Sequence, residues 1–294
     1  MSVARRQRTL RRTATVEGFG YFSGRDIRVD FCPAAAGAGV SFIRRDLGDV
    51  RLRIAPALRI DVPRRTTLEH DGVRVEMVEH ILATLSGLQV DNCDIVVDAS
   101  EMPGCDGSAL PFVQAIDAAG VVDQDARVRQ IKVRQTIRVG DSSSWMEARP
   151  ARQAGLSIAF ELDYGAHTAI GRQSIAVQVT PETFRTELAP CRTFLLEEVA
   201  RAMAAQGIGT RVTPQNLLIF TPAGPIDNTL RFVDECARHK VLDVVGDLAL
   251  TGCDILADVV AYRSGHKLHA ELASRLLEHA AATNDQRATI RLAS

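Results

Sequence analysis

The sequence predicts an α+β protein of two domains, and three observations support this prediction. The chain has 294 residues, about the length of two ordinary domains. In each half, short strand-like runs precede helical runs, an order typical of α+β domains and unlike that of a wound α/β sheet. A polar segment without a periodic pattern, 121–127, separates the halves. We therefore place the domains at 1–124 and 125–294.

In the first half, Gly and Pro separate short apolar runs, as in an antiparallel sheet. The period changes over 75–88, where apolar residues recur at helical spacing until Gly87. Cys93–Val97 then predicts a buried strand, and Asp106 or Ser108 is expected to cap a second helix. The four earlier strands are expected at Ala14–Val16, Ile27–Phe31, Val40–Ile43 and Val50–Ile54.

The second half has a similar order of elements but no close sequence repeat of the first. Helices are expected over Phe194–Gln206 and Asp234–Leu250, and a last helix begins near His266. The strands are expected at Ile131–Val139, Leu156–Leu162, Ser174–Val179 and Ile255–Tyr262.

Composition excludes several classes of protein. Hydrophobic residues make up 46% and charged residues 24%, which indicates a packed core and not a disordered chain. The net charge of -1 gives no electrostatic reason to expect nucleic acid as a partner. No apolar run approaches the roughly 18 residues of a membrane span. Six scattered cysteines and the absence of a signal-peptide pattern predict a reduced, cytoplasmic protein.

The N-terminal segment is rich in arginine, from Arg5 to Arg12. An arm that touches RNA or a membrane is one interpretation. A solvated tail that leads into an edge strand is the favoured one.

The expected helix Asp234–Leu250 carries the first candidate chemistry. His239, Asp243 and Asp247 are spaced by four and therefore share one face of a helix that is otherwise largely apolar. Imidazole and carboxylate at this spacing suit Zn²⁺, which takes three protein ligands and a water in catalytic sites. By itself, however, this spacing is more often a structural His–Asp pair.

A Glu-His pair, Glu79 and His80, lies in the apolar helix of the first half, where it is costly unless its polar groups are satisfied. In one interpretation His80 is a third metal ligand and Glu79 takes a proton from water. In the other, His80 is a satisfied core residue and Glu79 lies at the surface. His266 is a candidate proton donor, provided that an acid such as Asp247 keeps it charged.

The other histidines are expected to be non-catalytic, and two of them, His269 and His279, are expected at solvated helix positions. The remaining two are His70 and His167.

Taken in order, these motifs resemble one known family. The segments VEHILATLSGL, DNCDIVVDASEMPGCDGSALPF, CRTF, RHKVLDVVGDLAL and YRSGHKL resemble the UDP-3-O-acyl-N-acetylglucosamine deacetylases, from about Thr13 to about His279. The resemblance implies two α+β domains, each a mainly antiparallel sheet with two helices, and helices sandwiched between two outer sheets. It also implies a zinc amidohydrolase of lipid A synthesis that releases acetate from the 2-acetamido group of a UDP-glucosamine with a 3-O-hydroxyacyl chain.

The resemblance implies a role for each motif residue. His80, His239 and Asp243 correspond to the zinc ligands, and Glu79 to the general base. His266, oriented by Asp247, corresponds to the group that protonates the amine. The remaining implied contacts are Thr193 at the oxyanion, Lys240 as a cation beside the catalytic groups and the uridine diphosphate, and Phe194, Tyr164 and Arg263 at the substrate.

The resemblance also implies a strand–helix–strand insert at about 194–220 that encloses the acyl chain, although its apolar stripe is equally explained by core packing. Tyr164 stands where an aromatic stacks on uracil, and a core tyrosine is the alternative. The chain departs from the family near the substrate, which leaves acyl length and nucleotide contacts open: Phe22 replaces a common histidine, Arg211 and Val212 replace a Gly-Gly pair, and Ser143 and Ser144 replace a basic residue.

Three further expectations concern partners and alternatives. The metal is expected to be Zn²⁺, although sites of this type also accept Fe²⁺ or Co²⁺. The protein is expected to be a monomer with at most transient membrane contact, to which the arginine-rich arm adds a weak attraction for anionic surfaces. The alternative function is a catalytically altered relative that binds a related acylated sugar nucleotide.

Overall fold

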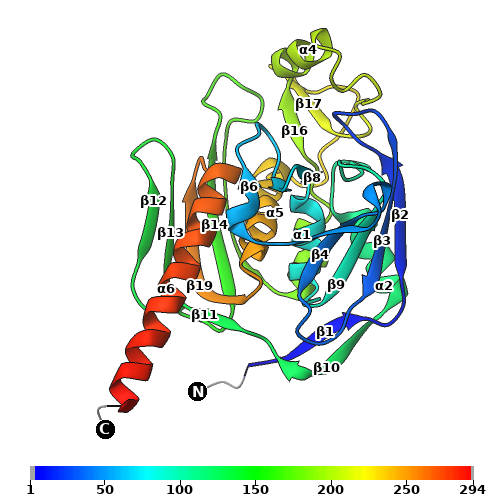
Figure 1. The fold of residues 1–294 in the computed structure, drawn as a ribbon. Coiled ribbons are helices and arrows are strands. Elements are labelled where there is room, and N and C mark those ends of the chain that lie inside the picture. The colour runs from blue at the N-terminus through cyan, green and yellow to red at the C-terminus, as the bar shows by residue number, and fades with distance from the viewer. Residues whose placement is uncertain (1–3, 293–294) are drawn as a thin grey trace.

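The computed structural model describes the backbone of residues 4–292 and the side chains as far as residue 283. It confirms the predicted α+β fold, with helices lying between two outer sheets (Figure 1). The proposed domain limits remain a prediction.

The sheet of the first half has five strands in the order β2-β3-β9-β4-β5. Neighbouring strands are antiparallel except β4 and β9, which are parallel. The five expected strands of this half are therefore present, with these bounds: β2 (Ala14–Phe19), β3 (Asp26–Pro33), β4 (Val40–Arg44), β5 (Val50–Arg53) and β9 (Cys93–Val97).

The sheet of the second half repeats this topology. Its order is β12-β13-β19-β14-β15, and β14 and β19 form the corresponding parallel pair. A sixth strand, β11 (Gln130–Lys132), pairs with β19 in parallel, so the single strand expected at Ile131–Val139 is two strands. The other bounds are β12 (Ile137–Gly140), β13 (Trp145–Pro150), β14 (Leu156–Asp163), β15 (Arg172–Val179) and β19 (Asp254–Tyr262).

Two helices, α1 (Glu79–Gly87) and α5 (Glu235–Leu248), pack against each other between the sheets (Figure 1). Nearly all their side chains are buried, as the apolar sequence pattern predicts. The expectation of a helix from residue 75 is wrong: 73–76 form a strand, and Met77 has φ of 58°, which separates that strand from the helix. Two further helices are α2 (Leu110–Ala119) and α6 (His266–Leu292).

The N-terminal segment and the connection between the halves pair with each other. β1 (Arg6–Leu10) is antiparallel to β10 (Val121–Arg127), so 121–127 is a strand and not an unpatterned connection. Arg5 adds ion pairs of 2.7 Å to both Asp91 and Asp254. These contacts favour the structural interpretation of the basic segment.

The insert lies at one end of the molecule and consists of β16 (Phe194–Leu196), α4 (Glu197–Ala205), β17 (Leu218–Thr221) and β18 (Gly224–Pro225) (Figure 1). The helix expected from Phe194 therefore starts later, because 194–196 pair in parallel with β17. In the described part of the chain, no helix is both long and apolar enough to cross a membrane.

Short elements complete the fold. The small sheet beside α1 contains β6 (Arg59–Ile60), β7 (Thr67–His70) and β8 (Val73–Glu76), and the short helices are Arg45–Leu47, Pro56–Leu58, α3 (Pro181–Thr183), Phe184–Leu188 and Ala249–Thr251.

Candidate active site

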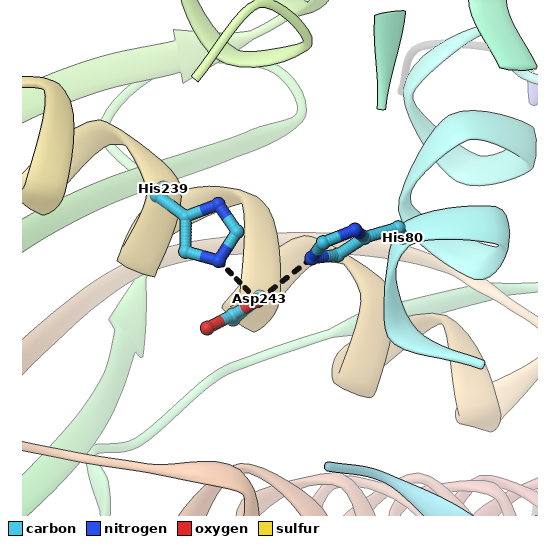
Figure 2. Close-up of side chains that lie close together, drawn as sticks. All are labelled: His80, His239 and Asp243. Atoms are coloured by element: carbon cyan, nitrogen blue, oxygen red, sulfur yellow. Dashed lines mark ion pairs between the residues drawn. The ribbon is translucent and has the colours of Figure 1, made fainter. Parts of the chain in front are cut away.

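The close approach of α1 and α5 brings the two motif helices together. Gly246 permits this approach, because a Cβ at its position would lie 2.1 Å from the carbonyl oxygen of Glu79. His80 therefore faces the α5 residues His239 and Asp243, although 159 positions separate His80 from His239 in the sequence. Figure 2 shows the three side chains converging from the two helices.

The geometry of these three side chains fits a metal ion. The Nε2 atoms of His80 and His239 lie 3.8 and 3.5 Å from Oδ1 of Asp243 (Figure 2). That oxygen is buried and has no hydrogen-bond partner among the described residues. Because a buried carboxylate oxygen without a partner is costly, a cation at the convergence of the three ligand atoms would satisfy it.

The protonation states of these three side chains would also suit metal binding. Burial lowers the pKa of His80, and lowers that of His239 to about 3, so both rings are neutral. His239 Nδ1 donates to the carbonyl of Cys191 at 3.1 Å, which leaves the lone pair of Nε2 directed at the site. Burial opposes ionisation of Asp243, but the positive charges of Lys240 and His266 hold its pKa well below the usual range.

A second buried group lies one helical turn further along α5, around Asp247. Its Oδ2 accepts hydrogen bonds of 2.7 Å from Nδ1 of both His266 and His269, and its Oδ1 accepts one of 2.5 Å from Thr66. Although burial opposes it, Asp247 raises the pKa of His266 to about 9, so the ring is protonated at neutral pH. His266 therefore has the charged state that a proton donor needs.

Glu79 begins α1 and is 5% exposed, so it is not the surface glutamate of the alternative interpretation. Its Oε2 accepts a hydrogen bond of 3.0 Å from the backbone N–H of Thr66. Burial raises the pKa of Glu79 to about 7. Such a carboxyl can take up and release a proton near neutral pH.

The group of His80, His239 and Asp243 borders a cavity of about 890 Å³, and the group around Asp247 borders the same cavity through His266. The cavity brings together most of the predicted site residues, with Thr193 and Phe194 contributed by the start of the insert. Lys240 Nζ donates to Oδ2 of Asp243 at 2.9 Å and lies 5.5 Å from the centre of the Phe194 ring. The predicted site residues on the cavity wall are Glu79, His80, Tyr164, Thr193, Phe194, His239, Lys240, Asp243 and His266.

Two expectations about substrate contacts meet different outcomes. Tyr164 is 38% exposed and stacks edge-on against Phe194 with ring centres 5.7 Å apart, so the core interpretation of this tyrosine is wrong. Arg263 is exposed and does not border the cavity. Its contact with substrate remains a prediction that this geometry does not favour.

Three of the unusual residues noted in the sequence line the same cavity: Phe22, Ser144 and Val212. Phe22 lies under the guanidinium of Arg65, at 3.8 Å from the ring centre. Arg211, in contrast, pairs with Asp26 at 2.8 Å. The departures from the resembled family therefore change the cavity wall more than the buried polar groups.

Comparison with known proteins agrees with this geometry. The model of one family, UDP-3-O-acyl N-acetylglycosamine deacetylase, matches residues 7–278. The chain belongs to this family. Its relatives include a UDP-3-O-acyl-N-acetylglucosamine deacetylase of Anaeromyxobacter dehalogenans, 36% identical over 96% of this chain and 91% of the relative. The proteins of the same name from Brucella ovis and Brucella melitensis are each 38% identical over 92% of this chain and 95% of the relative. Membership of the deacetylase family confirms the predicted enzyme class, a hydrolase.

Sequence reasoning missed two participants in the site of this deacetylase. Thr66 contacts both Glu79 and Asp247, and its position between two short strands carries no sequence signal. His269 is 0% exposed, so the prediction that it is solvated is wrong. The spacing of His266 and His269, three residues apart on one helix, was a usable signal, because such residues share a face.

Proposed function

We propose that this chain hydrolyses the N-acetyl group of UDP-3-O-(3-hydroxyacyl)-N-acetylglucosamine and releases acetate, with Zn²⁺ held by His80, His239 and Asp243. Family membership makes the chain a deacetylase of lipid A biosynthesis. The observation that carries the metal assignment is the unpartnered, buried Oδ1 of Asp243, with two neutral imidazoles directed at it. When bound, Zn²⁺ supplies a Lewis acid that polarises a carbonyl and lowers the pKa of water to about 7.

Glu79 acts as the general base in this proposal. It lies one residue from the proposed ligand His80, and Thr66 fixes one of its oxygens by a backbone hydrogen bond. The other oxygen remains free to accept a proton from the water that attacks the acetyl carbonyl. A carboxylate with a pKa near neutrality suits both accepting and releasing that proton.

His266 acts as the general acid. An amine is a poor leaving group unless it is protonated, and His266 is protonated at neutral pH because Asp247 stabilises its charge. Nδ1 of His266 is bound to Asp247, so Nε2 is the atom that can donate into the cavity.

Thr193 and Lys240 are proposed to contact the reacting group and the substrate. Thr193 is held by its backbone, which donates to Gly107 at 2.8 Å and accepts from Leu218 at 3.0 Å. These bonds hold the Thr193 backbone at the cavity wall, as the placement of an oxyanion donor requires. Lys240 supplies a positive charge beside the cavity for an anionic nucleotide sugar, and Tyr164 with Phe194 supplies exposed aromatic surface.

The acyl chain is proposed to lie between α4 and β17 of the insert. Residues of this insert supply an apolar wall of the cavity, and none of the residues of α4 is fully buried. An apolar face that is not buried is better explained as a binding surface for a hydrocarbon chain than as part of the packed core. The wall residues of the insert include Leu196, Val199, Ala200, Met203, Leu217 and Ile219.

The proposal also includes a cytoplasmic location, a monomeric state, transient membrane contact and domain limits at 1–124 and 125–294. They follow from the sequence expectations and from the lipid-like substrate. The non-catalytic alternative has no support, because Glu79 and His266 are both present and both border the cavity.

An acetate-release assay with the acylated UDP-sugar, combined with metal analysis, tests this function. We expect about one zinc per chain in active protein, and loss of acetate release in Glu79→Gln with zinc retained. Zinc-loaded wild-type protein that releases no acetate would contradict the proposal. Acyl chains of several lengths in the same assay would define the preference of the insert.

A further inference from the structure

His269 lies one turn after His266 in α6 and has no exposed surface. Both of its ring nitrogens have polar partners. Nδ1 lies 2.7 Å from Oδ2 of Asp247, and Nε2 lies 3.0 Å from Oγ of Ser264. A buried imidazole needs such partners to offset the loss of hydration, and the proposed reaction does not use this ring directly.

The surroundings determine where the protons lie. Burial lowers the pKa of His269, so the ring is neutral, while Asp247 is ionised and can only accept. Nδ1–H of His269 therefore donates to Asp247, and Nε2 accepts from the hydroxyl of Ser264. The result is a directed chain of hydrogen bonds from Ser264 through His269 to Asp247.

These hydrogen bonds hold the Asp247 carboxylate, which the proposed reaction does need. Oδ1 of Asp247 is held by Thr66, whereas Oδ2 is shared by two imidazoles. Of these, His266 borders the cavity and is only partly buried, while His269 is enclosed. The enclosed ring of His269 therefore fixes the position of Asp247 Oδ2, and the partly exposed ring of His266 aligns against this oxygen.

We propose that His269 is a positioning residue of the deacetylation, which fixes the Asp247 carboxylate and, through it, the ring of His266. This inference rests on the proposed function, in which His266 protonates the leaving amine. His269 does not line the cavity, so it acts without contact with the substrate.

Two substitutions separate this role from simple packing. In His269→Asn, the side-chain amide can place an N–H near the position of Nδ1 and keep the bond to Asp247. In His269→Gln, the longer side chain places its amide near Nε2, so it keeps the contact with Ser264 and loses the one with Asp247. Both variants remove the ring, which makes each the packing control for the other.

We expect His269→Gln to lower kcat by about tenfold or more, because small misplacements of a catalytic group carry costs of this order. KM and zinc content should stay at the wild-type level. His269→Asn should restore most of kcat. Equal kcat in the two variants, or a loss confined to KM or to zinc content, would overturn the proposal.

A measurement on the wild-type protein keeps the proposal testable if neither variant folds. ¹⁵N NMR of histidine-labelled protein should show His269 protonated on Nδ1 and bare on Nε2 at neutral pH. A ring protonated on Nε2 and bare on Nδ1 would overturn the proposal. This NMR measurement needs no turnover, so it tests the inference independently of the proposed function. Failure of the proposed function would instead be seen as zinc-loaded wild-type enzyme that releases no acetate.

Discussion

Two buried groups, each with one aspartate and two histidines, are built around aspartates one helical turn apart on α5, and they differ in how their polar atoms are satisfied. In the first, His80 and His239 stand 3.8 and 3.5 Å from an Asp243 oxygen that has no hydrogen-bond partner among the described side chains. In the second, Asp247 accepts bonds of 2.7 Å from His266 and His269. The first arrangement suits a bound cation, whereas in the second the carboxylate is already satisfied by hydrogen bonds from the two imidazoles.

The difference shows that residue type alone does not assign chemistry to such a group. Separation decides it: imidazoles within hydrogen-bond distance of a carboxylate share protons with it, while imidazoles further away leave space for an ion. The two groups also differ in protonation: burial keeps both rings of the first neutral, whereas Asp247 keeps His266 of the second protonated.

The largest expected effect is loss of the metal from the first group. His239→Ala should abolish zinc binding and reduce acetate release to background, because two ligands hold zinc much more weakly than three. Chelation of the wild-type enzyme should have the same effect, and added zinc should reverse it. The comparison fails if His269→Ala, in the second group, depletes zinc as strongly as His239→Ala when metal is measured by mass spectrometry.

Glu79→Gln should come next, with kcat lowered by about 10⁴-fold, the upper range for loss of a general base. The amide keeps the volume and an acceptor oxygen for Thr66, so zinc content and thermal stability should remain near wild type. Preserved activity in single-turnover assays would contradict the assignment of the base.

His266→Ala should lower kcat by about 10²–10⁴-fold while zinc binding stays largely intact. This combination would distinguish the second group, the proposed proton donor, from the first, the proposed metal site. Unchanged kcat, or a loss of zinc equal to that of His239→Ala, would show that the two groups are not separate in function.

The pH dependence should report the charge on Asp247. His266 must be protonated to act as an acid, so kcat should fall as pH rises through about 9. In Asp247→Asn the pKa of His266 should return toward its ordinary value, which moves this fall to lower pH. The free energy of unfolding should change in the same direction. The raised pKa of His266 stabilises the folded protein fully below about pH 6.5, and this contribution is lost as pH rises through about 9. A fall at an unchanged pH in the variant would contradict the coupling.

The smallest effect is expected from Gly246→Ala. The added Cβ would meet the Glu79 carbonyl at 2.1 Å, so α1 must move away from α5. We expect a loss of about 1–3 kcal/mol in the free energy of unfolding, as for an overpacked core, and weaker zinc binding. Ser86→Ala, on the exposed side of α1, is the control in thermal denaturation and zinc titration. Equal results for the two variants would show that this contact does not set the geometry of the first group.

Local sequence pattern was enough for the elements that carry strong periodicity. The strand Cys93–Val97, the helix around His239 and the start of α6 at His266 agree with the structure. Weak patterns failed where a partner decides the conformation: 121–127 became a strand because β1 pairs with it, and 194–196 became a strand because β17 pairs with it.

The sequence by itself determined the α+β class, the motif residues and the family, because spacing on a helix and the order of motifs are local properties of the chain. Only the tertiary structure decided how the two helices meet, that Thr66 links Glu79 with Asp247, and that His269 is buried. The physical reason is that burial and hydrogen bonding between distant segments depend on packing. A histidine one turn from the proposed general acid His266 has the same local sequence pattern whether water or an aspartate lies beside it.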